Sequence, residues 1–296
     1  MDNIYDKFGR NAGIFVKLDI LANADDDAFS KICNSSDEMK LICSNQLNAI
    51  QKQRHGDLTT YLYQKRCNNL LGESILQFKP VEMSWREFYE LTTKLFNSDI
   101  NIALANDYAS KGGFVELEIL KSLPPPKGPI VPNENGANQA GEAGRIDILK
   151  WMQDNNLPGM NQSGVNRAMR LKRGDLLIWL YNNNMTLPDV SGANTASTFD
   201  RLDILQLMKD YNLPLPNQFG VNSAAYHGNL NILKFMKKVN STLPDQFGSD
   251  LAAKGGHVNV LQWMRENNLP MPSQQGINDA CYNKNLEVLK WLKLNN

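Results

Sequence analysis

Residues 220–247 read GVNSAAYHGNLNILKFMKKVNSTLPDQF and form one copy of a unit that recurs every 28 residues. The glycine that opens the unit occurs at Gly136, Gly164, Gly192, Gly220, Gly248 and Gly276. Two residues later each copy carries Asn or Asp, and four residues later Ala. A fixed period with fixed anchor residues predicts a repeat array. Such arrays usually present binding surfaces rather than catalytic centres.

The first half of the unit predicts a short helix. Asn222 is expected to cap it at the N-terminal end, and Gly228 is expected to end it and turn the chain. The small residue Ala224 and its counterparts in the other copies allow adjacent units to pack closely. A glutamine recurs just before the glycine, and we expect it to bond between neighbouring loops. It is found at Gln162, Gln218, Gln246 and Gln274.

The second half predicts a second helix, which is amphipathic. Asn231 is expected to open it, and Asn240 to end it, because asparagine tolerates the left-handed conformation at a helix end. Between them, apolar residues have the i, i+1, i+3, i+4 spacing of a broad buried face. In residues 220–247 these are Ile232, Leu233, Phe235 and Met236. The Trp and Met residues at the equivalent positions are expected to form a stacking core.

The unit resembles a known repeat family. The strings at 228–236, 256–264 and 284–292 are similar to the second helix of ankyrin repeats, and the Ala-Ala-x-x-Gly segments at 224–228 and 252–256 to the end of the first. The compact unit resembles the divergent ankyrin proteins of giant DNA viruses. The resemblance implies an all-α fold with six ankyrin-like helix-turn-helix repeats, an α-solenoid, preceded by a small helical N-terminal domain. It also implies that His257 satisfies a turn.

The chain divides into three parts on this interpretation. Residues 1–98 do not repeat and contain several amphipathic segments, including one at Ser84–Glu87 whose pattern predicts a capping box. Residues 99–135 contain a degenerate first repeat followed by a proline-rich loop. Residues 136–296 contain the six regular repeats. Terminal repeats are commonly atypical, because one face must meet solvent.

The N-terminal part resembles a divergent F-box over residues 18–33 and 41–44, with a further Ser-Trp-Arg-Glu-Phe-Tyr stretch at 84–89. An F-box docks the Skp-type adaptor of cullin ubiquitin ligases through an amphipathic helical surface. The resemblance places Ile14, Leu18, Leu21 and Phe29 on that surface. The alternative interpretation is a helical cap that closes one end of the solenoid.

The resemblance also implies where a protein partner binds. In ankyrin folds the partner surface is concave and is built from the first helices and connecting turns. Residues just before the glycine that ends the first helix vary among the repeats of this chain, and several are Arg or aromatic residues typical of binding hot spots. The candidate partner-binding residues are Arg167, Arg170, Phe199, Tyr226, His227 and Tyr282.

Composition excludes several classes of function. Lys and Arg number 31, as do Asp and Glu, so the formal net charge is zero. Nucleic-acid binders usually carry a basic excess, and the apolar runs are too short to span a bilayer. The first ten residues have no signal-peptide shape. We therefore expect a cytoplasmic or nuclear protein that is not secreted and has no nucleic-acid or membrane partner.

The reactive side chains form no recognisable site. Cys33, Cys43, Cys67 and Cys281 show no Cys-x-x-Cys spacing, so we expect reduced thiols and no metal site. His227 has no nucleophile in its own repeat. We expect no catalytic residue and no cofactor.

The functional expectation is therefore a non-catalytic protein–protein interaction module. Its most specific form is a viral substrate receptor that recruits targets to a host ubiquitin ligase. The alternative is a structural or assembly scaffold. In that case the chain could oligomerise through its C-terminal repeat, where Leu294 adds apolar surface.

Overall fold

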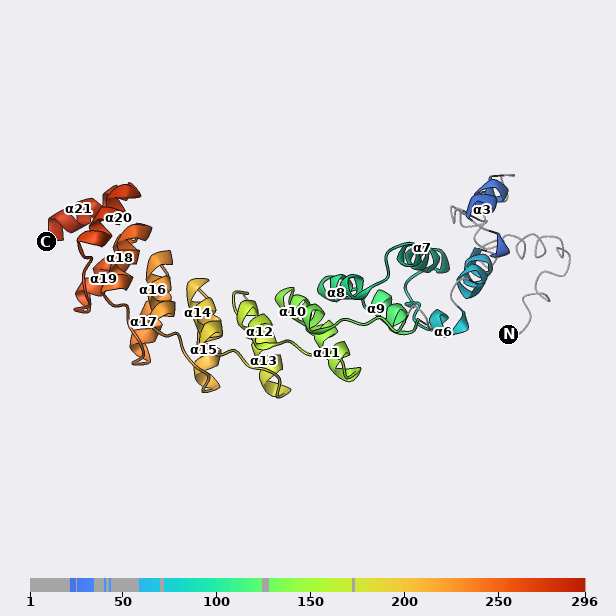
Figure 1. Cartoon of the computed structure of the whole chain (residues 1–296), viewed down its shortest axis with the longest axis horizontal. Helices are drawn as coiled ribbons and strands as arrows, with labels where there is room; N and C mark the ends of the chain where they lie inside the picture. The colour runs from blue at the N-terminus through green and yellow to red at the C-terminus, as the bar shows by residue number, and fades with distance from the viewer. Residues whose placement is uncertain are drawn as a thin grey trace. The chain divides into compact units, whose positions relative to one another are not determined.

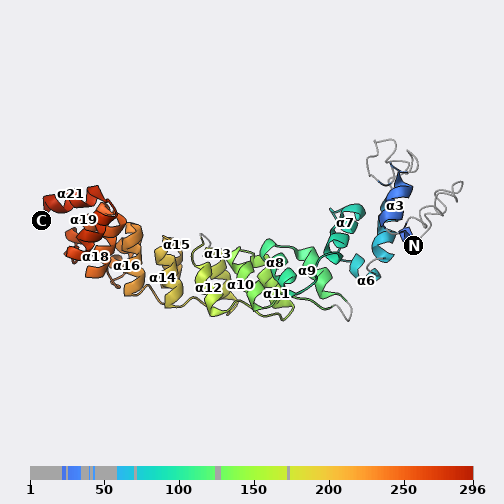
Figure 2. The same ribbon diagram turned by 45° about the horizontal axis from the view of Figure 1, so that its top comes forward.

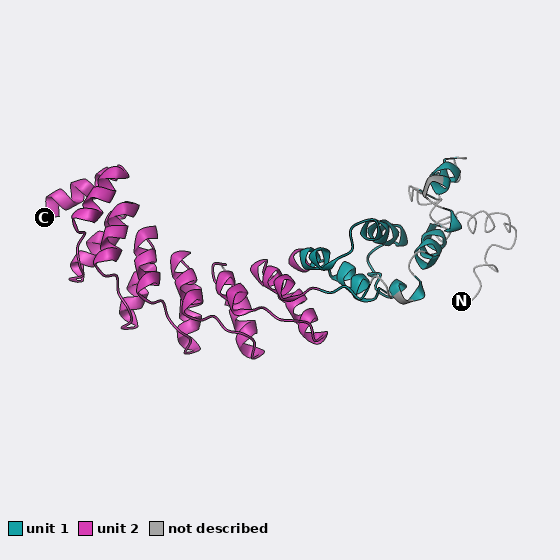
Figure 3. Cartoon of the chain, in the orientation of Figure 1, with its two compact units in different colours: residues 1–108, 113–131 teal, residues 109–112, 132–296 magenta. Residues whose placement is uncertain are grey.

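The computed structural model describes residues 22–24, 26–34, 40, 43, 59–69, 72–123, 128–171 and 174–295. All of the regular secondary structure in these ranges is helical, as the sequence predicts. The chain forms two compact units (Figure 3). The first contains residues 1–108 and 113–131, and the second contains residues 109–112 and 132–296.

The first unit is a non-repeating helical assembly. The helices among its described residues include α3 (Asp26–Cys33), residues 59–69, α6 (Glu73–Leu76), α7 (Trp85–Phe96), α8 (Ile102–Lys111), of which residues 109–111 belong to the second unit, and α9 (Phe114–Lys121). The predicted capping box at α7 is confirmed: Ser84 Oγ accepts from the Glu87 N–H at 3.2 Å, and the Ser84 N–H donates to Glu87 Oε2 at 2.8 Å. Leu62, Ile75 and Phe88 lie fully buried in its core.

The second unit contains six helix pairs in chain order (Figures 1 and 2). The first helices are α10 (Glu134–Glu142), α12 (Gln162–Ala168), α14 (Val190–Thr198), α16 (Gln218–His227), α18 (Gln246–Gly255) and α20 (Gln274–Tyr282). The second helices are α11 (Ile146–Asp154), α13 (Gly174–Asn182), α15 (Leu202–Asp210), α17 (Leu230–Lys238), α19 (Val258–Glu266) and α21 (Leu286–Asn295). Consecutive first helices pack on one another, and the alanine column between them is buried. The helical repeat array is confirmed.

Two of the predicted helix starts are wrong. Helix α16 begins at Gln218 and is capped by Asn217, whose side chain accepts from the Phe219 and Gly220 N–H groups, so Asn222 lies inside the helix. Helix α17 begins at Leu230, one residue before Asn231. The predicted ends are confirmed by the left-handed φ angles of Gly228 (75°) and Asn240 (51°).

The Asn or Asp inside the first helix accepts a hydrogen bond from the next repeat in α10, α12, α14, α16 and α18, which explains the first error. The Oδ1 of Asn138 accepts from the backbone N–H of Asn161 in the next repeat at 3.0 Å. A Cβ at Gly164 would collide with that same Asn138 side chain. The bond recurs four times, from Asp189 to Asn166, Asn217 to Asn194, Asp245 to Asn222 and Ser273 to Asp250. The glycine of one repeat therefore makes room for the asparagine of the repeat before it.

The predicted glutamine bonds between loops are confirmed at three positions. Gln162, Gln218 and Gln246 each donate from Nε2 to a backbone carbonyl at 2.9–3.0 Å. The acceptors lie in the loop after the second helix of the same helix pair, at Leu187, Leu243 and Met271. The fourth, Gln274, donates instead to Asn278 in its own helix. Side chains at the start of the second helices make a further link, because Asn229 and Asn285 donate to the last carbonyls of the preceding repeat's first helix.

The expectation of four reduced thiols is wrong for two of them. Cys33 and Cys43 form a disulfide with their Cα atoms 5.8 Å apart, while Cys67 is buried and Cys281 exposed as free thiols. The sequence does not reveal this pairing, because it depends on how residue 43 returns to the end of α3. The Tyr63 hydroxyl donates to the Cys43 carbonyl at 2.8 Å and holds it there. No helix among the described residues has the length and apolarity needed to cross a bilayer.

Candidate protein-interaction site

The first helices of the second unit share a solvent-exposed surface. The residue before the repeat glycine is exposed in all six repeats. The residues six and seven positions after the glycine are exposed or half-buried in all six. Positions separated by seven residues lie on the same side of a helix. We call the surface formed by these positions on α10, α12, α14, α16, α18 and α20 the first-helix face. All six candidate partner-binding residues lie on or directly beside it.

Arg167 and Arg170 form a cluster with one carboxylate. Arg167 Nε donates to Glu142 Oε1 at 2.8 Å, and Arg170 Nη2 donates to Glu142 Oε2 at 2.9 Å. The two arginine side chains remain 49% and 46% exposed. Glu142 therefore holds two guanidinium groups side by side at the surface, bridging α10 and the end of α12.

The aromatic candidates come from three other repeats. Phe199 follows α14, Tyr226 and His227 end α16, and Tyr282 ends α20. All four side chains are exposed, Tyr282 most of all at 88%. The rings of Tyr226 and His227 meet edge to face, with centroids 4.9 Å apart. The structure thus pairs these two and spreads the others along the face.

Sequence reasoning missed two residues of the same face. Phe219 and Phe247 lie at the residue before the glycine in α16 and α18 and are 71% and 62% exposed. The same position holds Asn135, Ser163, Ser191 and Gln275 in the other repeats. A large apolar residue at a position that is otherwise polar was the available signal.

His257 has the structural role that the sequence predicts. Its ring lies against Gly228 of the preceding repeat and is hydrogen-bonded to the Tyr226 backbone. Burial lowers the pKa of this imidazole below its usual value, against the opposing effect of the backbone bond. The side chain therefore belongs to the links between repeats and not to the first-helix face.

The F-box-like surface is only partly described. Ile14, Leu18 and Leu21 lie outside the described residues. The ring of Phe29 contacts the Tyr63 ring with centroids 6.1 Å apart and lies 3.9 Å from the Arg66 guanidinium carbon. The half-buried Phe29 side chain therefore contributes to packing inside the first unit.

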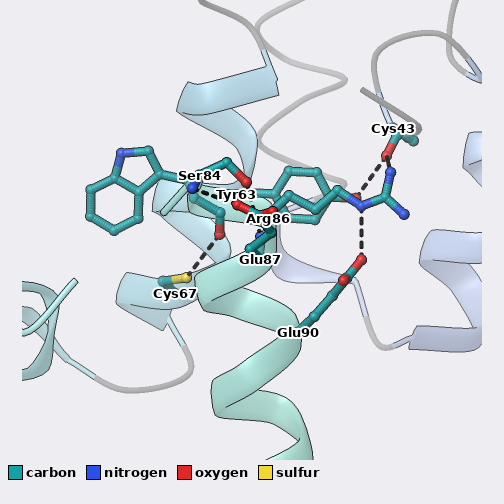
Figure 4. Close-up of polar contacts among 8 residues, drawn as sticks. Cys43, Tyr63, Cys67, Ser84, Arg86, Glu87 and Glu90 are labelled. Atoms are coloured by element: carbon teal, nitrogen blue, oxygen red, sulfur yellow. Dashed lines mark hydrogen bonds and ion pairs between the residues drawn. The ribbon is translucent and has the colours of Figure 1, made fainter. Parts of the chain in front are cut away.

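A polar network joins α7 to the disulfide (Figure 4). Arg86 donates to the Cys43 carbonyl at 3.3 Å and to Glu90 at 2.8 Å, and the Glu90 bond raises the arginine pKa. Burial raises the pKa of the Tyr63 phenol and raises that of the Cys67 thiol to about 12. A thiol with so high a pKa is a poor nucleophile at neutral pH. The network is suited to holding the unit together rather than to catalysis.

The described structure contains open hollows on both units. One, of about 700 Å³, lies in the first unit beside α7, and its lining includes Glu82, Glu90 and Lys94. Another, of about 900 Å³, lies beside α13 in the second unit, and its lining includes Met160 and Trp179. Neither lining includes a histidine, cysteine or serine. Among the described residues no group of three or more His, Cys, Asp or Glu is placed to hold a metal ion.

No protein-family model matches this chain, and no curated protein matches it. Neither comparison bears on the ankyrin or F-box resemblance, and both resemblances stay predictions. The functional argument therefore depends on the geometry of the first-helix face.

Proposed function

We propose that this chain is a non-catalytic protein–protein interaction module whose first-helix face binds a protein partner. The observation that carries the proposal is the exposure of Phe219, Phe247 and Tyr282 on one face of a repeat array. Exposed aromatic side chains gathered on one surface are typical of protein-binding sites. A repeat array provides a rigid support for such a surface, because each repeat is fixed by its neighbours.

The contrast between two sets of positions in each repeat, those that bond to neighbouring repeats and those on the first-helix face, supports this proposal. Links between repeats use the repeat glycine, which occurs in all six repeats, and the Asn or Asp two residues after it. A glutamine adds a bond at three positions. The first-helix face makes few of these bonds, and its residues differ from repeat to repeat. A surface that varies over a constant scaffold is what recognition of one irregular partner requires.

The specific form of the proposal is a viral substrate receptor acting in the host cytoplasm or nucleus. The F-box-like segment would hold a Skp-type ubiquitin-ligase adaptor, and the repeat array would select the target. The resemblance of residues 18–33 and 41–44 to an F-box supports the adaptor half. Helix α3 covers residues 26–33 of that segment, as a helical F-box requires.

Affinity purification of the tagged full chain from a eukaryotic cell, with mass spectrometry, tests both halves. Ile14→Asp with Leu18→Asp should remove a Skp-type adaptor and leave the other co-purifying proteins in place. Phe219→Ser with Phe247→Ser should do the reverse, and serine occupies the same position at Ser163 and Ser191. If no co-purifying protein depends on either pair of substitutions, the interaction-module proposal is wrong.

A scaffold is the second candidate, and one observation favours it. Leu286 and Leu294 of α21 are exposed, although leucines of this kind in a repeat array usually pack on a neighbouring repeat. On this alternative, two copies would associate through α21. Light scattering across a range of protein concentrations tests it: Leu286→Lys with Leu294→Lys should abolish any self-association. A chain that is monomeric at all concentrations excludes this form of the scaffold.

A further inference from the structure

The first-helix face changes in chemistry along the array. Its early part, on α10 and α12, carries the Glu142–Arg167–Arg170 cluster. The middle part on α14 carries the hydroxyl side chains of Thr195 and Thr198. Phe199, directly after α14, begins a series of exposed aromatic residues that continues with Phe219 and Tyr226 on α16, Phe247 on α18 and Tyr282 on α20. A partner that covers the whole face must therefore meet two different surfaces.

The arginine cluster has an excess of positive charge. Glu142 accepts one bond on each carboxylate oxygen, so one negative charge is shared between two guanidinium groups. Arg167 also donates from Nη1 to Ser163 Oγ at 2.8 Å, which fixes its orientation further. Two arginines already held side by side lose little side-chain entropy when a carboxylate binds. Their planar donors match a carboxylate in geometry and charge.

The part of the face on α18 and α20 contains one ion pair, in which a positive and a negative charge are balanced. Lys254 and Asp279 lie 3.7 Å apart and balance one another. Phe219 and Tyr226 are seven residues apart on α16, so both project from the same side of that helix. Phe247 occupies the position of Phe219 in the adjacent repeat. The result is an apolar surface over two neighbouring helices, which favours aliphatic or aromatic side chains in a partner.

We infer that the first-helix face binds a linear segment of a partner protein with an acidic end and an apolar end. A carboxylate of the segment pairs with Arg167 and Arg170, and apolar side chains cover Phe219 and Phe247. Helices α12 and α16 are two repeats apart, or about 20 Å at roughly 10 Å per packed helix. An extended peptide covers that distance in about six residues. The inference rests on the proposed function and specifies the partner's chemistry.

Nucleic acid fits this surface poorly. Binding to a phosphate backbone requires several neutralising cations in a row, and the cluster offers two arginines that share a carboxylate. Bases of a single strand can stack on Phe219 and Phe247, but the cluster leaves only one net positive charge to neutralise the backbone beside them. A peptide with separated acidic and apolar residues meets both parts of the face.

Selection from a random 16-residue peptide library displayed on phage, with the immobilised full chain as target, tests the inference directly. Enriched peptides should carry an acidic residue about six positions from a cluster of aliphatic or aromatic residues. Synthetic copies of these peptides should lose affinity as salt concentration rises, because one contact is a surface ion pair. No enrichment, or enrichment without that pattern, overturns the inference.

Variants based on the chain's own repeats identify the surface. Phe219→Ser with Phe247→Ser copies Ser163 and Ser191, while Arg167→Thr with Arg170→Thr copies Thr195 and Thr198. Each pair should weaken binding of the selected peptide about tenfold or more, since each removes one of the two contacts. Only the arginine pair should also remove the salt dependence. Circular dichroism melting shows that each variant remains folded.

Tyr181→Gln provides the matched control, because Tyr181 is an exposed aromatic residue of the second helix α13 and Gln153 occupies the same repeat position. It should leave peptide affinity unchanged. If the selected peptide binds equally to both double variants, the inference is wrong even though peptide binding is real. The interaction-module proposal is tested separately by the affinity purification, and it fails when no co-purifying protein depends on either pair of substitutions used there.

Discussion

The two units of this chain are stabilised in different ways. In the second unit the same bonds recur in successive repeats, such as Asn138 to Asn161 and Asn222 to Asp245. In the first unit the contacts that join separate segments of the chain each occur once, as in the Cys33–Cys43 disulfide and the bond from Tyr63 to Cys43. When one bond between repeats is removed, the neighbouring repeats should loosen while the others keep their structure. In the first unit no second copy of a lost contact exists, so its loss should affect the whole unit.

The largest effect should follow from removing a stacking tryptophan. Trp263 of α19 is buried, so Trp263→Ala should cost about 3–5 kcal/mol through lost contacts and a residual cavity. Because contacts join neighbouring repeats, loosening should begin in α18–α21 and leave the first unit unchanged. Hydrogen exchange by mass spectrometry measures this region by region. Uniform loosening of both units would contradict the contrast drawn above.

The disulfide offers the corresponding test in the first unit. Reduction of Cys33–Cys43, which are ten residues apart, should destabilise this unit by about 2–4 kcal/mol. The second unit should not respond, and Cys281→Ala, which copies Ala225 and Ala253, serves as a control. Thermal unfolding with and without reductant measures the effect. Before reduction, iodoacetamide should label Cys281 in the native chain. Labelling of Cys33 would show that the disulfide is absent.

The repeat glycine and the asparagine of the preceding repeat should be energetically coupled. Gly164→Ala places a Cβ against the Asn138 side chain and should cost about 1–3 kcal/mol. In an Asn138→Ala background the same change should cost about 1 kcal/mol less, because much of the obstruction is gone. Chemical denaturation of the two single variants and the double variant gives the coupling energy. Additive costs would mean that the two residues act independently.

The sequence was sufficient for features that repeat or are local. The six helix pairs, the capping box at Ser84 and the glutamine bonds to following loops were all predictable, because each depends on spacing within one or two units. The role of Asn222 was misjudged because its partner lies in the next repeat, and a cap and an inter-repeat acceptor prefer the same residue type.

Single-copy features were beyond the sequence. Nothing in the spacing of Cys33 and Cys43 indicates a bond, because the return of residue 43 to α3 depends on Tyr63 and Arg86 from other helices. The candidate site was predicted in part. Its arginine and aromatic residues near the first-helix ends were predicted, but Phe219 and Phe247 were not. The identity of a phenylalanine alone does not show that it is exposed, and the signal lay in comparing the repeats, which have polar residues at that position elsewhere.

The smallest expected effect concerns His257, which links two repeats through the Tyr226 backbone. Burial lowers its folded-state pKa below the unfolded value of about 6.5, so below that pH the unfolded chain binds more protons than the folded chain. The stability contributed by neutral His257 is therefore complete above about pH 6.5 and decreases as pH falls toward the folded-state pKa. Hydrogen exchange in α18 and α19 measures it.

His257→Asn is the matched variant, because Asn229 and Asn285 fill the same position in other repeats and donate to backbone carbonyls there. The variant should keep the link between repeats and remove this part of the pH dependence. Other ionisable groups are common to both proteins, so the difference between them isolates His257. If the stability of the parent chain relative to the variant is flat with pH, or falls as pH rises, the imidazole is not held in its neutral form. The link between repeats would then accept a charged imidazole, although the His257 ring lies against Gly228 of the preceding repeat. The repeated contacts of the second unit would in that case depend less on the protonation of one side chain than its burial indicates.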